Sequence, residues 1–426
     1  MILSLFFRAV LGLGRIFHFD SLSDRGLAVL TAGRRVLGRC AFGSLLRSVP
    51  LEEAARFQTA TEPPLTEAHE HTVSVDEHAI ARFTKKFSIA EGFHSIRNRQ
   101  MKVEQVAFLF DVAHRLVRSV VVAVGSASLA TVTEPALAWM RRHAGGAEVR
   151  VILDAGAAKE HAALWRLVDH PNQVTLVRVP RTPGRRKQWE ALASHRWHPL
   201  TEPGAYKGAA EKVVHWAETV THLVVDKKSK TTVSVRTIVV RESRRSGKEK
   251  WHALWIFGDG STLPWDVVRE YRQRQHHEQA HRVMLHDAQL DAAPSGYDKK
   301  SPDPAQPAFA PAALTLWTWL VGLAFNELEL FSQALPDGWK HAHPRTLRRW
   351  LLTIPAAMYL TPKALIVLLQ PPYQREVIEG LVEAANRAPA RIPWLSDRKL
   401  ILAVDQPGQI GPEAAIVPEK CPSGVW

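Results

Sequence analysis

Three side chains suited to phosphate and metal chemistry stand at helical spacing late in the chain. Tyr271, Arg274 and Glu278 occupy positions i, i+3 and i+7, so an α-helix would carry them on one face. A carboxylate can bind a divalent cation, an arginine can hold a phosphate with two hydrogen bonds, and a tyrosine can donate to a phosphate oxygen. The spacing therefore predicts a metal-dependent phosphodiester site, although a solvated charged helix face has the same residue types.

Two aspartates lie in β-like segments elsewhere in the chain. Asp76 lies in the β-branched run VSVDEHAIARF, and Asp154 follows the apolar run VRVIL. Together with Glu278 they would supply three carboxylates, which can hold two Mg²⁺ or Mn²⁺ ions about 4 Å apart. Each aspartate also has a structural interpretation, Asp76 as a turn or edge residue and Asp154 as the cap of the following helix. The order of the three acids favours a joint role.

The elements around these acids follow a defined order. Three strand-like runs come first, in VSVDEHAIARF, KVEQVAFLFDVAHR and SVVVAVGSAS, and a helix in TEPALAWMRRHA follows. The strand VRVILDAGAA, a helix from Lys159 to Asp169 and the strand VTLVRV complete the pattern. This is the order of the ribonuclease H-like fold, which has one acid in its first strand and another after its fourth.

The predicted fold class is α/β, with a ribonuclease H-like catalytic core interrupted by a β-rich insertion and with small helical N- and C-terminal regions. The N-terminal region is basic and helical, and it either binds DNA ends or packs on the next domain. The predicted boundaries are 1–66 for this region, 67–180 for the first part of the core, 181–262 for the insertion, 263–352 for the second part of the core with the glutamate helix, and 353–426 for a C-terminal helical region and Pro-rich tail.

The charge balance points to a polyanionic partner. Fifty-five Lys and Arg against 42 Asp and Glu give a formal net charge of +13, which favours nucleic acid over an acidic membrane surface. The two cysteines are too few for a disulfide framework or a thiolate zinc site and indicate a reducing compartment. The apolar runs at 1–17 and 312–325 are interrupted by arginines or too short for a bilayer span, so both are predicted to be buried helices. No phosphate-binding loop of the GxxxxGK[ST] type is visible.

The acid-bearing segments resemble the DDE transposases of bacterial insertion sequences, in particular the "insertion sequence four" group with its Y-x2-R-x3-E-x6-K signature. The segments are VDEHAIARFTKKF, VILDAGAAKEHAALWRLV and YRQRQHHEQAHRVMLHD, within a resemblance that covers roughly residues 73–350. The resemblance implies two groups of site residues: the catalytic, metal-binding Asp76, Asp154 and Glu278, and the DNA-contacting Tyr271 and Arg274.

The same resemblance implies an activity: metal-dependent cleavage at the ends of the element and transfer of the freed 3′-hydroxyl into target DNA. It also implies a homodimer on paired ends, in the bacterial cytoplasm at the nucleoid. One departure is that the lysine of the signature falls on Leu285, which leaves the DNA-hairpin step associated with that lysine open. Lys299 and Lys300 follow the helix, but a solvated loop pair is the simpler interpretation. Two alternatives remain, a ribonuclease H-like nuclease and a non-catalytic DNA-binding protein from a decayed transposon.

Basic residues at two further places are predicted to contact DNA. One group follows the first acid strand and the other opens the insertion: Lys85, Lys86, Arg97, Arg99, Arg181, Arg185, Arg186 and Lys187. Related enzymes stack a flipped base on an aromatic side chain, for which Trp251 and Trp255 are candidates. Packing in the interior of the insertion is nevertheless the prediction for both tryptophans.

Overall fold

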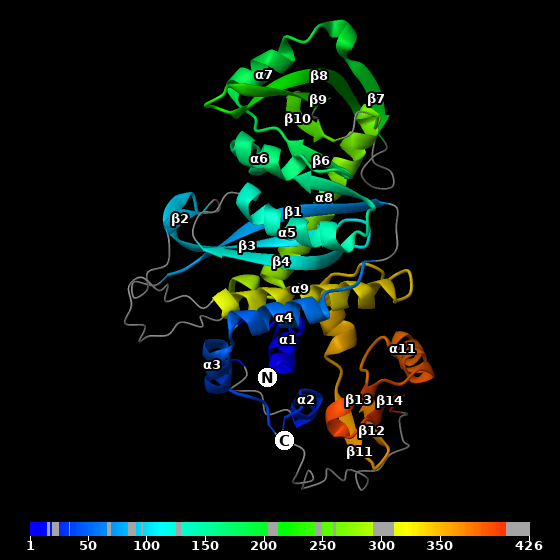
Figure 1. Cartoon of the computed structure of the whole chain (residues 1–426). Helices are drawn as coiled ribbons and strands as arrows, with labels where there is room; N and C mark the ends of the chain where they lie inside the picture. Colours follow the sequence, from blue (N-terminus) through cyan, green and yellow to red (C-terminus); the bar gives the residue numbers. More distant parts are fainter. Residues whose placement is uncertain are drawn as a thin grey trace, which may run out of the picture. The chain divides into compact units, whose positions relative to one another are not determined.

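The fold is known from a computed structural model that describes residues 1–14, 18, 25–33, 35–65, 70–83, 91–94, 97–124, 129–202, 212–243, 249–258, 261–292 and 311–405 (Figure 1). The chain divides into two units. The first comprises Met1–Val49, Arg282–Gly296 and Leu320–Trp426, and the second comprises Pro50–His281 and Tyr297–Trp319. All three predicted catalytic acids belong to the second unit.

The central sheet of the second unit has the ribonuclease H-like strand order. Strands β1 (Glu70–Ala81), β3 (Arg99–Asp111) and β4 (Leu116–Val124) pair antiparallel, while β5 (Glu148–Leu153) and β6 (Gln173–Arg178) lie parallel to β1 on its other side. The order β4-β3-β1-β5-β6 is the expected one, and the predicted α/β class with a ribonuclease H-like core is confirmed. A short strand β2 (Glu91–His94), which was not predicted, pairs with the start of β3.

Alternation along β1 explains how the predicted catalytic Asp76 can lie in a core strand. Val73 and Val75 join the hydrophobic core with Leu137 and Met140 of helix α5 (Leu129–His143). The residues between and after them, Ser74 and Asp76, point to the opposite face of the sheet, because successive side chains of a strand alternate. Helix α6 (His161–Val168) adds Leu164 and Leu167 to the same core as α5.

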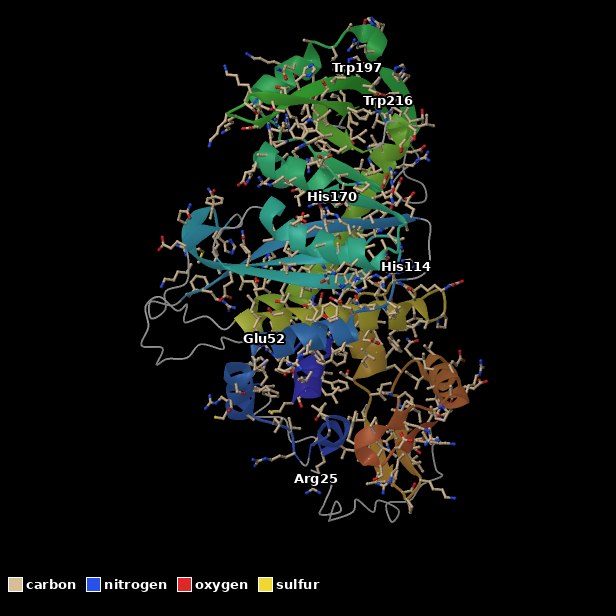
Figure 2. The ribbon with its side chains drawn as sticks, in the orientation of Figure 1. Arg25, Glu52, His114, His170, Trp197 and Trp216 are labelled. Atoms are coloured by element: carbon tan, nitrogen blue, oxygen red, sulfur yellow. The ribbon has the colours of Figure 1, made fainter. Side chains whose placement is uncertain are left out.

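The predicted β-rich insertion extends the central sheet. Helix α7 (Pro183–Glu190) leads into β7 (His198–Glu202), β8 (Lys212–Asp226), β9 (Thr231–Ser243) and β10 (Glu249–Phe257), and β10 pairs antiparallel with β6. Trp197 and Trp216 lie among these strands (Figure 2). The turn after β10 requires a glycine, because Gly258 has a φ of +90° and a Cβ atom there would lie 2.1 Å from the carbonyl oxygen of Gln173.

The two candidate stacking tryptophans are interior residues of this extended sheet. Trp251 is 4% exposed and Trp255 is fully buried, and both belong to the same hydrophobic core as Val73. The prediction that they pack inside the insertion is confirmed. Neither side chain is available to a flipped base in this arrangement.

The N-terminal region is helical as predicted, with α1 (Ile2–Val10), α2 (Arg25–Leu30) and α3 (Arg39–Ser48) in the first unit. These helices are tied to the C-terminal part of that unit, where Arg348 donates to the carbonyl oxygen of Ala9 and Trp394 donates to that of Val29. Helix α4 (Leu51–Thr61), however, belongs to the second unit. Its Gln58 donates to Ser119 of β4 over 2.8 Å.

The C-terminal region contains more strand than the sequence suggested. Helix α11 (Arg375–Arg387) agrees with the predicted helical character, but it lies beside a sheet of order β11-β12-β14-β13. The strands are β11 (Ala356–Leu360), β12 (Ala364–Leu369), β13 (Arg391–Ile392) and β14 (Arg398–Val404). They are short runs between prolines, and periodicity does not distinguish such runs from buried helix. The predicted Pro-rich tail lies mostly beyond residue 405, outside the described residues.

Two long helices complete the described chain. Helix α8 (Pro264–His286) carries the predicted glutamate, and α9 (Pro311–Gln333) contains the apolar run at 312–325 that was predicted to be a helix. Helix α1 covers part of the other apolar run, whose last three residues lie outside the described residues. A one-turn helix α10 (Pro344–Leu347) continues into a π-helical turn over Arg348–Leu352. Short 3₁₀ turns lie at Ala157–Lys159, Ser194–Arg196, Leu290–Ala292 and Pro393–Leu395. Among the described helices, none has the length and apolar character needed to cross a bilayer.

Candidate active site

The pairing of β1 with β5 brings the two aspartates together. Val75 is aligned with Leu153 in the parallel register, so Asp76 and Asp154 are the next residues along neighbouring strands. Helix α8 supplies Arg274, whose Nη2 donates to Asp76 Oδ2 at 3.1 Å and lies 3.8 Å from Asp154 Oδ2. The Nη1 of the same guanidinium donates to Glu278. The three predicted acids therefore meet around one arginine.

Helix α8 is held in place by contacts on either side of this cluster. One turn before Arg274, Glu270 accepts two hydrogen bonds of 2.7 Å from Arg150 of β5. After Arg274, the Nδ1 atom of His277 lies 2.6 Å from the hydroxyl oxygen of Ser74 in β1. Buried bidentate pairs fix orientation as well as distance, so these contacts set the rotation of α8 that points Arg274 at the acids.

The acids are not equally exposed. The side chain of Asp76 is 18% exposed and that of Glu278 is 51% exposed. Burial raises the pKa of Asp76 to about 6; Arg274 opposes this shift, and the negative charges of Asp154 and Glu278 add to it. Ionisation of Asp76 therefore costs more in the folded, metal-free protein than in an unfolded chain, as is common for carboxyl groups arranged for cation binding.

Sequence reasoning missed a fourth carboxyl group at this site. Burial raises the pKa of Glu77 to about 7, with a further increase from Asp76 and an opposing effect of Lys159. Its Oε2 atom is buried and makes no hydrogen bond with any described residue. The sequence gives no signal for this residue beyond its position next to Asp76. Neighbouring side chains of a strand point to opposite faces of the sheet, so the carboxyl group of Glu77 was not expected near the same site.

Tyr271 is close enough to the cluster to interact electrostatically with its charged groups. Its hydroxyl is buried and has no hydrogen-bond partner among the described residues. Burial raises its pKa, and the charges of Arg274, Asp154 and Arg178 also act on it. The phenol is therefore neutral at ordinary pH and has a proton to donate to an incoming oxygen.

The donor set fits a hard divalent cation. Asp76, Asp154 and Glu278 offer only oxygen ligands, which Mg²⁺ and Mn²⁺ prefer. Asp154 Oδ1 is buried without a hydrogen bond, and Arg178 is 4.0 Å away from it. Within the described residues, no three Asp, Glu, His or Cys side chains already form a metal-binding group, and here Arg274 lies between the acids. These three residues would hold the ions once the guanidinium moved.

Two of the residues predicted to contact DNA after the first acid strand, Arg97 and Arg99, lie within the described residues. Arg99 begins β3, and Arg97 lies over the ring of Phe83, 4.8 Å from its centre, with that ring 70% exposed. Lys85 and Lys86 lie outside the described residues, as do Lys299 and Lys300. The structure does not test DNA contact by any of them, and it stays a prediction.

The basic residues that open the insertion differ in their partners. In α7, Arg186 pairs with Glu190 over 2.6 Å, whereas Arg185 lies over Trp255 and donates to the carbonyl oxygen of Pro180. Arg181 and Lys187 are exposed. A guanidinium already neutralised by a carboxylate has less to gain from a phosphate, so Arg185 is the stronger candidate of the two arginines in α7.

Comparison with known proteins gives matches to solved structures but none to family models or curated proteins. No protein-family model matches the chain, and no curated protein matches it. Among solved structures, the chain is similar to a piggyBac transposase seen by cryo-EM in a synaptic complex with hairpin DNA. The TM-score is 0.42, with 12% sequence identity over 81% of this chain and 68% of that chain. A likeness this distant decides neither fold nor function, which rest on the strand order and the side chains described above.

Proposed function

We propose that this protein is a DNA transposase of the DDE type that cleaves at the ends of a mobile element and joins the freed 3′-hydroxyl to target DNA. The observation that carries the proposal is the meeting of Asp76, Asp154 and Glu278 around Arg274, where Asp76 lies midway along β1 and Asp154 directly follows β5. A ribonuclease H-like sheet with carboxylates at this place suits phosphodiester chemistry. The formal charge of +13 suits a DNA substrate.

Each residue of the site has a part in this reaction. Asp76, Asp154 and Glu278 would hold two divalent ions, which when bound activate the attacking oxygen and stabilise the leaving oxygen. Tyr271 is neutral and buried, so it can donate a hydrogen bond to a phosphate oxygen. Arg274 can pin the same phosphate through its two terminal nitrogens. Glu270 and Ser74 hold α8 so that Glu278 faces the two strand acids.

The finer parts of the proposal rest on resemblance. Membership of the "insertion sequence four" group rests on the spacing of Tyr271, Arg274 and Glu278 on α8. A homodimer on paired ends rests on the family alone. Leu285, half-buried on α8 where the signature has lysine, cannot bind a phosphate by charge, so any hairpin step would need another cation.

The test is cleavage of a plasmid that carries the DNA flanking the gene. Asp154→Asn is expected to reduce Mn²⁺-dependent cleavage at the element ends by at least about a thousandfold, because the variant removes a ligand charge from the ion site. DNA binding should change less than about threefold, since binding depends on basic residues elsewhere. Asp337→Asn, the same change at an exposed side chain outside the site, is the control and should still cleave.

Two results would overturn the proposal. Cleavage that ignores the element ends would indicate a nuclease with the same fold. Binding by the wild-type protein with no cleavage under any divalent ion would indicate a decayed copy that retains only DNA binding.

The ion site should also depend on pH. The pKa of Asp76 is raised to about 6, so below that pH a proton must leave before the carboxylate can bind an ion. The affinity for Mn²⁺ is expected to fall by about tenfold per pH unit below pH 6 and to level off above pH 7. Electron paramagnetic resonance of free Mn²⁺ between pH 5 and 8 measures this, and an affinity that stays constant across the range would contradict it.

A further inference from the structure

Arg274 is the only cation that contacts all three predicted ligand acids among the described residues. Arg274 is 7% exposed. Burial by itself lowers its pKa, but the charges of Asp76, Asp154, Tyr271 and Glu278 raise it above the usual value. Arg274 therefore stays protonated and acts as the counter-ion of the cluster.

The guanidinium uses oxygen atoms that an ion would need. Nη2 donates a hydrogen bond to Asp76 Oδ2, and Nη1 donates one to a carboxylate oxygen of Glu278. A divalent cation on these carboxylates would meet a positive charge at a few ångströms, where repulsion in a partly buried site is strong. Arg274 in its present place and a fully bound ion exclude each other.

The side chain can move, whereas the helix is held. The Nε atom of Arg274 is buried and makes no hydrogen bond with a described residue, so the guanidinium is held only through its terminal nitrogens, by the acids. Helix α8 itself is fixed by two hydrogen-bonded ion pairs. Its Glu270 accepts from Arg150 over 2.7 Å, and its Arg272 donates to Glu242 over 2.9 Å. Release of the acids thus frees the side chain without a shift of the helix.

We infer that Arg274 is a built-in competitor of the metal ions and exchanges between two partners. Before loading, it neutralises Asp76, Asp154 and Glu278; when divalent ions take those oxygens, the freed guanidinium passes to a phosphate of the DNA. This inference rests on the proposed function. Metal and DNA are therefore expected to bind cooperatively. Bound ions release the guanidinium to a DNA phosphate, and a phosphate that holds the guanidinium keeps it away from the oxygen atoms that the ions need.

Metal binding to the full chain tests this without any cleavage. Mn²⁺ affinity is measured by electron paramagnetic resonance at pH 8, where Asp76 is ionised, for the wild type, Arg274→Gln, Arg274→Met and Arg274→Lys. Both uncharged variants are expected to bind Mn²⁺ at least about tenfold more tightly, and the lysine variant within about threefold of wild type. Arg269→Gln, an exposed change on the same helix that breaks only a surface pair with Asp266, is the matched control and should not change the affinity.

A second measurement adds a duplex oligonucleotide from the flanking DNA with a blocked 3′ end. The duplex is expected to tighten Mn²⁺ binding to the wild type at least about fivefold and to leave Arg274→Gln unchanged. The melting temperature of each variant shows whether the substitution has disrupted folding. If one of the two uncharged variants is unfolded, the Mn²⁺ affinity of the other one tests the inference.

The outcomes separate the inference from the proposed function. If Asp154→Asn abolishes Mn²⁺ binding but Arg274→Gln and Arg274→Met bind no more tightly than wild type, the exchange is wrong and the metal site stands. If Asp154→Asn binds Mn²⁺ as tightly as wild type, the acids are not ligands and the proposed function fails with it.

Discussion

Replacing Asp76 with asparagine is expected to stop DNA cleavage and, at the same time, to stabilise the metal-free protein. The pKa of Asp76 is raised to about 6 in the folded chain from an ordinary value of 3.8. The folded state therefore binds this proton more tightly than the unfolded state does, and ionisation destabilises the fold as pH rises from about 4 to 6. Above pH 6 the full cost, on the order of 1–3 kcal/mol, is present, and the neutral amide avoids it.

Thermal unfolding in the presence of a chelator measures this effect. At pH 7.5 the Asp76→Asn variant should melt several degrees above wild type, and at pH 4 the difference should disappear because the wild-type carboxyl is then protonated. Asp266→Asn, at the start of α8 with a side chain 52% exposed, is the control and should shift the melting temperature little. A variant that melts below wild type at pH 7.5 would show that the carboxylate stabilises the fold after all.

The second large effect is expected at the contact that holds α8. Arg150 is 6% exposed and donates two hydrogen bonds to Glu270. Glu270→Gln leaves that guanidinium buried with less neutralising charge, which typically costs about 3–5 kcal/mol. Glu148 still accepts from Arg150 over 2.9 Å, so the lower end of this range is expected. Cleavage should fall by roughly tenfold to a hundredfold, because α8 positions Arg274 and Glu278.

Chemical denaturation and cleavage rates together measure this. Glu190→Gln removes the exposed pair with Arg186 and should cost less than about 1 kcal/mol. The double change Arg150→Met with Glu270→Leu should recover much of the stability, because an apolar pair avoids burying charge, but it should not recover the full cleavage rate. Full recovery of both would mean that the ion pair has no part in positioning the helix.

Much of the ribonuclease H-like core could be predicted from sequence because its signals are local. The run VRVIL before Asp154 is buried along most of its length, as a strand covered on both faces must be. The spacing of Tyr271, Arg274 and Glu278 depends only on helical periodicity, and α8 spans all three. These features need no knowledge of which strands pair.

The rest depends on contacts between distant segments. Arg178 neighbours Asp154 only because β6 lies parallel to β5, and Arg150 meets Glu270 across 120 residues of sequence. The strands β11 to β14 are two to seven residues long, too short for an alternating pattern to stand out.

The pairing of β10 with β6 has a consequence for the evolution and engineering of this chain. Leu254, Trp255, Ile256 and Phe257 cover the open hydrogen-bonding side of β6, which would otherwise be the last strand of the core. An unpaired strand edge of this kind invites aggregation. The segment from 181 to 262 therefore cannot simply be deleted. A shortened version of the chain would need another strand, or a charged residue or proline, to cover or block the edge of β6 and prevent aggregation.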